Sequence, residues 1–163
     1  MNNATKIRAR AAARPISKQR LRLWIRILRS ARAIESELRE RLRTEFAITL
    51  PQFDVMATLA RKDGGMSMTE LSRMLMVSNG NVTGIIDRLV AEKIVLRQAP
   101  ANDRRSFIVR LTPKGAEQFA SIAKAHEAWV NEFLSNIGGA EAEGLIQRLD
   151  GLAARVRSGG SRQ

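Results

Sequence analysis

The sequence predicts a mainly α-helical protein with one small β-hairpin, built as a winged helix-turn-helix whose N- and C-terminal helices form a dimer. Three observations predict this class. Apolar residues recur at helical spacing towards both ends of the 163-residue chain. Two short helices with capping residues follow each other across a tight turn within residues 67–90. Apolar and polar residues then alternate around a short loop, as in a hairpin.

The first long helix is expected over residues 17–46. Its apolar stripe consists of Trp24, Leu28, Ala31, Ile34, Leu38 and Leu42. Glu35 and Arg39 are four residues apart, as are Glu37 and Arg41, so both pairs are expected to form ion pairs on an exposed face.

A second helix is expected to begin at Pro51 and to end at Asp63-Gly64-Gly65. Proline is favoured in the first turn of a helix, and glycine just past its end. The inward-facing residues of this helix are expected to be Phe53, Met56, Leu59 and Ala60.

Two capped helices come next. Ser67 and Glu70 have the spacing of a capping box, and Ser78 is placed to cap the helix that follows the Met76-Val77 turn. The buried residues of the two helices are expected to be Leu71, Met74 and Leu75, then Val82, Ile85, Ile86, Leu89 and Val90.

The hairpin is expected to pair residues 95–100 with residues 106–111 across a five-residue loop. Thr112-Pro113 then starts a long helix, and Gly138-Gly139 separates it from a last helix. The apolar face of that last helix contains Leu145, Leu149, Leu152 and Val156. Because the outer helices carry more apolar surface than one small core needs, two copies are expected to bury it together.

The composition favours a polyanionic partner. The net charge is +12, which suits nucleic acid, anionic lipid or a phosphorylated small molecule; tuning for solubility alone is the alternative. The chain has no cysteine and one histidine, His126, so thiolate chemistry, cysteine redox sensing and a histidine-rich metal site are excluded. No cofactor, metal or membrane span is expected, and a cytoplasmic location is the default.

The start of the second short helix has the side chains that read DNA. Asn79, Asn81 and Thr83 can donate to and accept from base edges in the major groove, and Gly80 lets the helix end approach closely. The residues expected to meet the phosphate backbone are Ser67, Thr69, Ser78 and Arg88. For Ser67 and Ser78 the alternative role is capping alone, and the two roles are compatible.

The hairpin loop carries Asn102-Asp103-Arg104-Arg105. Arg104 and Arg105 are expected to enter the narrow minor groove, whose negative potential attracts guanidinium groups. Asp103 would repel phosphate, so its expected role is to orient a neighbouring arginine. The alternative is an ordinary solvated turn.

These motifs together resemble the MarR family of bacterial transcription regulators over residues 17–156. The most specific parts are Thr69-Glu70-Leu71-Ser72, Asp87-Arg88-Leu89, Asp103-Arg104-Arg105-Ser106 and Leu111-Thr112-Pro113-Lys114-Gly115. The run from Met76 to Thr83 is similar to a narrower group within the family. Those regulators control the breakdown of hydroxycinnamic and related aromatic acids, and several respond to the acyl-coenzyme A thioester.

The resemblance implies a homodimer that binds double-stranded DNA at an inverted repeat and represses aromatic acid catabolism genes until a small effector releases it. An aromatic acyl-CoA is the expected effector, and a free aromatic carboxylate is the alternative. Its predicted site combines an apolar pocket and arginines that hold its anionic groups: Arg22, Trp24, Arg26, Ile27, Leu28, Arg29, Phe53 and Met56. Each apolar member has ordinary core as its alternative role, and the arginines have a solvated basic face.

The domain organisation follows from these elements. Residues 1–16 are expected to be a flexible basic arm, with a transit peptide as the alternative, and residues 159–163 a disordered tail. Between them, residues 17–46 and 113–158 supply the dimerisation helices, and residues 51–112 the DNA-binding lobe. The rival classes are a ligand-independent basic DNA-binding protein, a membrane-surface protein and an enzyme. An enzyme is disfavoured because no nucleophile–base pair, phosphate-binding glycine loop or carboxylate pair can be placed.

Overall fold

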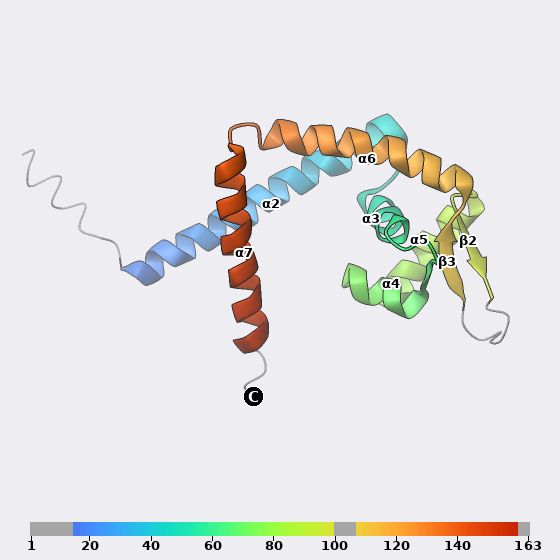
Figure 1. Cartoon of the computed structure of the whole chain (residues 1–163), viewed down its shortest axis with the longest axis horizontal. Coiled ribbons are helices and arrows are strands. Elements are labelled where there is room, and N and C mark those ends of the chain that lie inside the picture. The colour runs from blue at the N-terminus through green and yellow to red at the C-terminus, as the bar shows by residue number, and fades with distance from the viewer. Residues whose placement is uncertain (1–14, 100–106, 160–163) are drawn as a thin grey trace, which may run out of the picture. The chain divides into compact units, whose positions relative to one another are not determined.

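The computed structural model describes residues 15–99 and 107–159. Its elements, in chain order, are α2 Ile16–Phe46, α3 Leu50–Ala60, β1 Met66–Ser67, α4 Met68–Leu75, α5 Asn79–Ala91, β2 Val95–Gln98, β3 Ile108–Leu111, α6 Pro113–Phe133 and α7 Gly139–Gly159 (Figure 1). This confirms the mainly helical class with a small antiparallel sheet. In the described ranges, no helix has the length and apolar character needed to cross a membrane.

The chain divides into two units, residues 1–123 and residues 124–163, and α6 runs from the first into the second. The first unit holds α2 to β3 and the first half of α6. Within it, α3, α4, α5 and the three strands pack on one another and are called the lobe below. The second unit holds the rest of α6 and all of α7.

The sheet contains one strand more than the sequence predicted. Its order is β1-β3-β2, with both pairings antiparallel. β2 and β3 are the expected hairpin strands, although each is shorter than predicted. β1 pairs Met66 with Val109 and Ser67 with Ile108, which joins the start of α4 to the hairpin. A strand of two residues has too little alternation to stand out in a sequence.

The core of the lobe is apolar and well sealed. Its fully buried large side chains come from α3, α4, α5 and both hairpin strands: Val55, Met56, Leu71, Val82, Ile86, Leu89, Val95 and Val109. Two predicted core positions are wrong. Ala60 is exposed at the last residue of α3, and Met74 is exposed because the buried face of the two-turn helix α4 is centred on Leu71 and Ser72.

Side-chain caps fix the starts of the lobe helices. The predicted capping box of α4 is confirmed, since the Ser67 amide donates to Glu70 Oε2 (2.9 Å) and the Glu70 amide donates to Ser67 Oγ (3.2 Å). Ser78 Oγ accepts from the Asn81 amide at 3.4 Å, as expected of the α5 cap. α3 has a capping box between Thr49 and Gln52 that the sequence reading missed, although its T-x-x-Q spacing is a recognised signature.

Gly115 fixes how α6 leaves the sheet. A Cβ at this position would lie 2.0 Å from the backbone oxygen of Ile94, so only glycine fits without a shift of the backbone. Thr112 tightens the same junction, because its hydroxyl donates to the Lys93 oxygen (2.8 Å) and accepts from the Gly115 amide (2.9 Å). The junction therefore holds the end of α5, the end of β3 and the start of α6 together.

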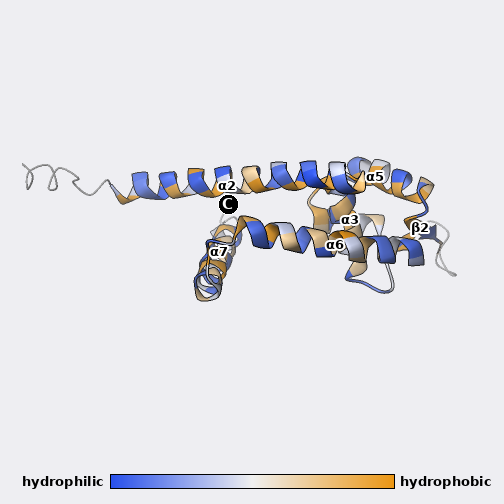
Figure 2. Cartoon of the chain, turned by 90° about the horizontal axis from the view of Figure 1, so that it is seen from above, coloured by the Kyte–Doolittle hydropathy of each residue, from blue (hydrophilic) through white to orange (hydrophobic). Residues whose placement is uncertain are grey.

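The outer helices differ from the lobe. α2 begins at Ile16, one residue before the prediction, and buries only Leu38 and Leu42, near its C-terminal end. The two predicted ion pairs on its surface are confirmed, Glu35–Arg39 at 2.5 Å and Glu37–Arg41 at 2.9 Å. α7 buries no residue. Figure 2 shows apolar residues along both helices interspersed with polar ones.

Candidate nucleic-acid interface

The start of α5 presents small polar side chains to solvent. Ser78 has extended backbone angles and its side chain caps the helix, so the next residues form the first turn. Asn79, Asn81 and Thr83 are all exposed. The Thr83 hydroxyl donates to the Asn79 oxygen (2.9 Å), which leaves its lone pairs available as acceptors. A helix with an exposed polar start can insert that start into the major groove.

Two glycines lie four residues apart on the same helix face. Gly80 and Gly84 are exposed, and a Cβ built on either one meets nothing within 4 Å. Neither has a left-handed backbone angle. Glycine inside a helix costs about 1 kcal/mol relative to alanine, and no packing within the lobe explains that cost at Gly84. A smooth face of this kind suits the close approach of a duplex.

The start of α4 carries a second set of candidate contacts. Thr69 is exposed, and Ser67 is half-buried in the capping box with Glu70. The pKa of Glu70 falls from 4.5 to about 2, first because the Ser67 amide donates to its carboxylate and second because Lys62 does so as well. The carboxylate therefore stays ionised at any physiological pH and keeps the cap closed.

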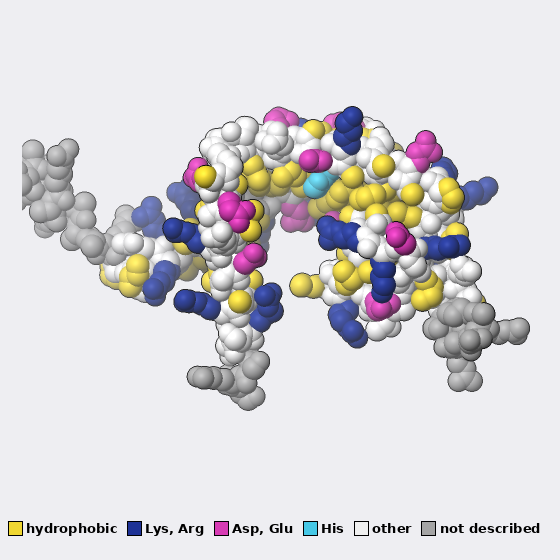
Figure 3. All heavy atoms as spheres, viewed as in Figure 1, with side chains coloured by type: hydrophobic (Ala, Val, Ile, Leu, Met, Phe, Trp, Pro, Cys, Tyr) yellow, Lys and Arg dark blue, Asp and Glu magenta, His cyan; other side chains and the backbone are white. Residues whose placement is uncertain are grey.

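An ion pair ties α5 to the hairpin. Arg97 on β2 donates to Asp87 on α5, with Nη2 to Oδ1 at 2.5 Å. This contact connects β2 of the hairpin to α5. Arg88, the predicted phosphate contact, is exposed on the next position of α5. The predicted contacts Asp103, Arg104 and Arg105 lie outside the described residues. Figure 3 shows lysine and arginine side chains standing out over the lobe.

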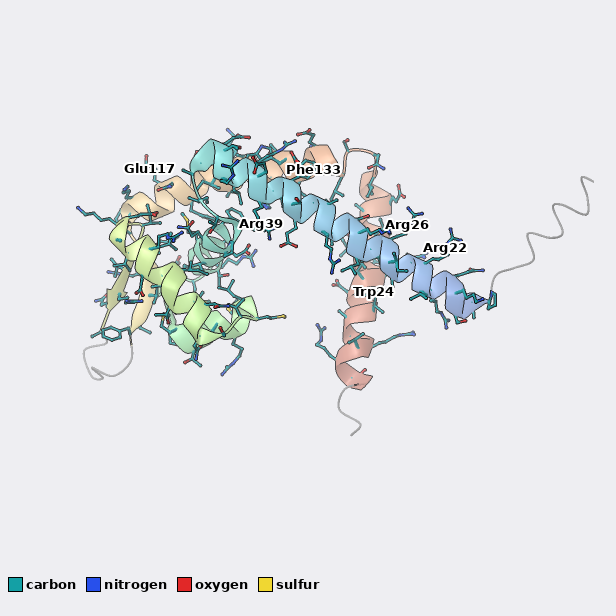
Figure 4. All side chains as sticks on the ribbon, turned by 180° about the vertical axis from the view of Figure 1, so that it is seen from behind. Arg22, Trp24, Arg26, Arg39, Glu117 and Phe133 are labelled. Atoms are coloured by element: carbon teal, nitrogen blue, oxygen red, sulfur yellow. The ribbon has the colours of Figure 1, made fainter. Side chains whose placement is uncertain are left out.

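The structure does not bring the predicted ligand residues together within one chain. Arg22, Arg26 and Arg29 are exposed, and Trp24 is 54% exposed. Figure 4 shows the labelled members of this group on the half of α2 that extends away from the lobe. Ile27 and Leu28 are half-buried on the same stretch.

The remaining two predicted ligand residues are far from this group. Phe53 and Met56 are buried in α3, where the Phe53 ring lies 5.8 Å from the ring of Phe119. α2 is buried only around Leu38 and Leu42, and Trp24 precedes Leu42 by 18 residues, or about 27 Å of helix. The apolar stripe of α2 suggested that this helix and α3 share a pocket. Such a stripe shows which face of α2 is apolar, but not which of its turns contact α3.

A pocket does exist elsewhere in the first unit. It has a volume of about 250 Å³ and lies between the end of α3, β3 and the first turns of α6. Its lining residues include Leu59, Lys62, Asp63, Arg110, Ala116 and Phe119. None of these was predicted as a ligand residue, since they come from three separate parts of the chain and share no sequence pattern.

Comparison with known proteins gives a consistent family. The model of the MarR family matches residues 48–107, which cover most of the lobe. The transcriptional regulator MhqR of Bacillus subtilis is 23% identical over 134 residues, covering 82% of this chain and 91% of MhqR.

Solved structures extend the likeness to nearly the whole chain. A MarR family transcriptional regulator from Silicibacter pomeroyi superposes with a TM-score of 0.73 at 31% identity, covering 88% of this chain and 99% of that one. A mutant of MarR from E. coli, complexed with operator DNA, gives a TM-score of 0.71 at 26% identity, covering 85% and 99%.

Proposed function

Because this chain belongs to the MarR family of transcriptional regulators, we propose that it binds an inverted-repeat operator as a homodimer. α5 would enter the major groove and the arginines of the hairpin loop the adjacent minor groove. The observation that carries this proposal is the exposed start of α5, where Asn79, Gly80 and Asn81 face solvent. An asparagine there can pair with adenine through two hydrogen bonds.

The dimer is supported by apolar surface that one chain leaves uncovered. On α2 the exposed large apolar side chains include Ile16, Leu21, Leu23, Trp24 and Ile25. On α7 they are Leu145, Ile146, Leu149, Leu152 and Val156. A symmetric pair of chains would present two copies of α5 to half-sites about one helical turn of DNA apart, roughly 34 Å.

The regulated process is proposed to be aromatic acid catabolism, with the protein acting as a repressor in the cytoplasm. The run from Met76 to Thr83 supports this, through its similarity to regulators of hydroxycinnamic acid breakdown. The first proposed effector, which would release the protein from its operator, is an aromatic acyl-CoA. The exposed Arg22, Arg26 and Arg29 are suited to its phosphates. Titration of the operator complex with the free acid and with its thioester tests both forms, and release by neither would leave a ligand-independent DNA-binding protein.

Substitution of Arg104 tests the minor-groove contact. Arg104→Ala should reduce operator affinity by roughly 1–3 kcal/mol while leaving the thermal midpoint of unfolding unchanged. The measurement is a gel-shift titration at fixed salt, because phosphate contacts make affinity strongly salt-dependent. Arg61→Ala is a matched control, since Arg61 is an exposed arginine at the end of α3 that has no proposed DNA contact. An unchanged midpoint for Arg104→Ala would remove the hairpin loop from the interface.

A further inference from the structure

The positive charge of the chain is concentrated in its first 34 residues. Ten of the 28 lysines and arginines lie there and none of the 16 aspartates and glutamates, so residues 35–163 carry 18 cations against 16 acids, a net charge of +2. Residues 51–112, which include α5 and the hairpin, have nine cations and six acids. The charge that favours a polyanionic partner therefore lies mostly outside the proposed operator interface.

The described part of this basic segment carries a row of cations on α2. Five exposed cations are spaced by four, four, three and three residues along the helix. We call them the basic row: Lys18, Arg22, Arg26, Arg29 and Arg32. At 3.6 residues per turn, this spacing places them on one side of α2, opposite the side on which Leu38 and Leu42 are buried. Figure 4 labels Arg22 and Arg26 on this part of the helix.

The rest of α2 carries its charges differently. There three arginines each pair with a glutamate three or four residues away, as Arg39 does with Glu35 and Arg43 with Glu40. No member of the basic row has an ion pair with a residue that the structure describes. Like charges three or four residues apart destabilise a helix, and a cation in the first turn, such as Lys18, opposes the helix dipole. A bound polyanion would remove this cost, because it would neutralise the row.

The length of the basic row matches the backbone of a DNA duplex. From Lys18 to Arg32 the helix rises by about 21 Å, and one DNA strand passes about six phosphates over that length. Five cations in line therefore correspond in number and extent to the phosphates of one strand. An anionic bilayer is the competing partner. It would also need the exposed apolar side chains on this part of α2, such as Trp24, which the proposed dimer covers.

We propose that the basic row binds the phosphate backbone of duplex DNA without reading its sequence, as a contact surface separate from α5 and the hairpin. The inference rests on the proposed function for its choice of DNA as the polyanion. A contact with phosphates adds equally to operator and non-operator affinity, so it leaves discrimination to α5. Because the row includes the three arginines proposed above to hold the phosphates of an acyl-CoA, that ligand and a duplex would exclude each other there.

Binding to a random-sequence duplex tests the row, with affinity measured by fluorescence anisotropy between about 50 and 200 mM salt. Each lost phosphate contact lowers the slope of log affinity against log salt by about 0.9. The double variant Arg22→Gln, Arg26→Gln should therefore lower the slope by about two, which is roughly a tenfold difference in affinity across this salt range. Its thermal midpoint of unfolding should not fall, because the change removes like-charge neighbours from an exposed face.

The double variant Arg39→Gln, Arg43→Gln is the matched control. It removes two arginines from the same helix and changes the net charge equally, but each of these arginines already pairs with a glutamate. Its slope should stay close to that of the wild type. An unchanged slope in Arg22→Gln, Arg26→Gln would overturn the inference. Equal losses of slope in the two double variants would also overturn it, since they would reflect net charge alone.

Two further measurements identify the partner. The ratio of operator to random-duplex affinity should be unchanged in Arg22→Gln, Arg26→Gln, whereas Asn81→Ala should lower it. Equal binding of operator and random duplex by the wild type would defeat the proposed function and leave the salt test of the row intact. The membrane alternative is measured with vesicles that contain about 30% phosphatidylserine. Vesicle binding that Arg22→Gln, Arg26→Gln loses, with its duplex slope unchanged, would assign the row to a membrane surface and overturn the inference.

Discussion

The lobe and the outer helices of this protein differ in how far they bury their apolar side chains. The lobe buries its own core: its helices have side-chain caps, most of its large apolar side chains are buried, and the exposed residues at the start of α5 are small and polar. Met74 and Met76 are among the exceptions, since both are exposed. The outer helices do the reverse, since the N-terminal half of α2 and all of α7 expose apolar side chains to solvent. The difference indicates that the lobe buries its core within a single chain, whereas the outer helices carry the apolar surface that the proposed dimer would cover.

The largest expected effect is at Gly115, in the first turn of α6, where this helix leaves the sheet of the lobe. Gly115→Ala places a methyl group 2.0 Å from the Ile94 oxygen, and forced backbone shifts of this kind cost about 1–3 kcal/mol of unfolding free energy. Gly151→Ala is the matched control in α7, where a Cβ meets nothing within 4 Å and alanine should stabilise the helix slightly. Denaturant titration of both variants measures the two changes in the free energy of unfolding. Equal stability would mean that the lobe is less tightly closed than its geometry implies.

The next effect concerns the outer helices. Leu149→Glu adds a charge to the exposed apolar face of α7, so it should leave the lobe folded and separate the two chains. Sedimentation should then show a species of about 18 kDa, the mass of one chain. Loss of the second half-site should weaken operator affinity by roughly a hundredfold.

Gln147→Glu makes the same change of charge at an exposed polar position of α7. This control should keep the assembly of the wild type. If the wild-type protein itself sediments as a single chain at low micromolar concentration, the outer helices do not need a partner and the contrast between the two regions disappears.

The smallest expected effect is in α5, where one substitution should raise the stability of the protein and weaken its binding to DNA. Gly84→Ala should raise the free energy of unfolding by about 0.5–1 kcal/mol, because alanine is the better helix former and the position is open. The same methyl group should weaken operator binding, since it stands on the face of α5 that is proposed to approach the duplex. Gly151→Ala should give a similar gain in stability with unchanged affinity. Operator binding that stays at wild-type strength in Gly84→Ala would place the duplex away from this face.

Local patterns in the sequence predicted the lobe better than the outer helices. Ser67 and Ser78 were identified as caps because a cap depends on residues three positions apart. Trp24 was expected on the apolar stripe of α2 but is 54% exposed, because a helical stripe shows which face is apolar but not which turns contact a neighbour. The pocket residues Lys62, Arg110 and Phe119 share no sequence pattern for a related reason: only the folded chain brings the end of α3, β3 and the first turns of α6 together.

The start of α5 is proposed to read base pairs, and the substitution Asn81→Ala examines that role without changing the rest of the interface. Affinities of the wild-type and variant proteins are measured for a panel of operators that carry each single base-pair change. If Asn81 pairs with one base, the variant should lose about 1–3 kcal/mol of discrimination at one position in each half-site and keep it elsewhere. A uniform loss across the whole panel would contradict the claim, because it would reduce Asn81 to a contact with the phosphate backbone.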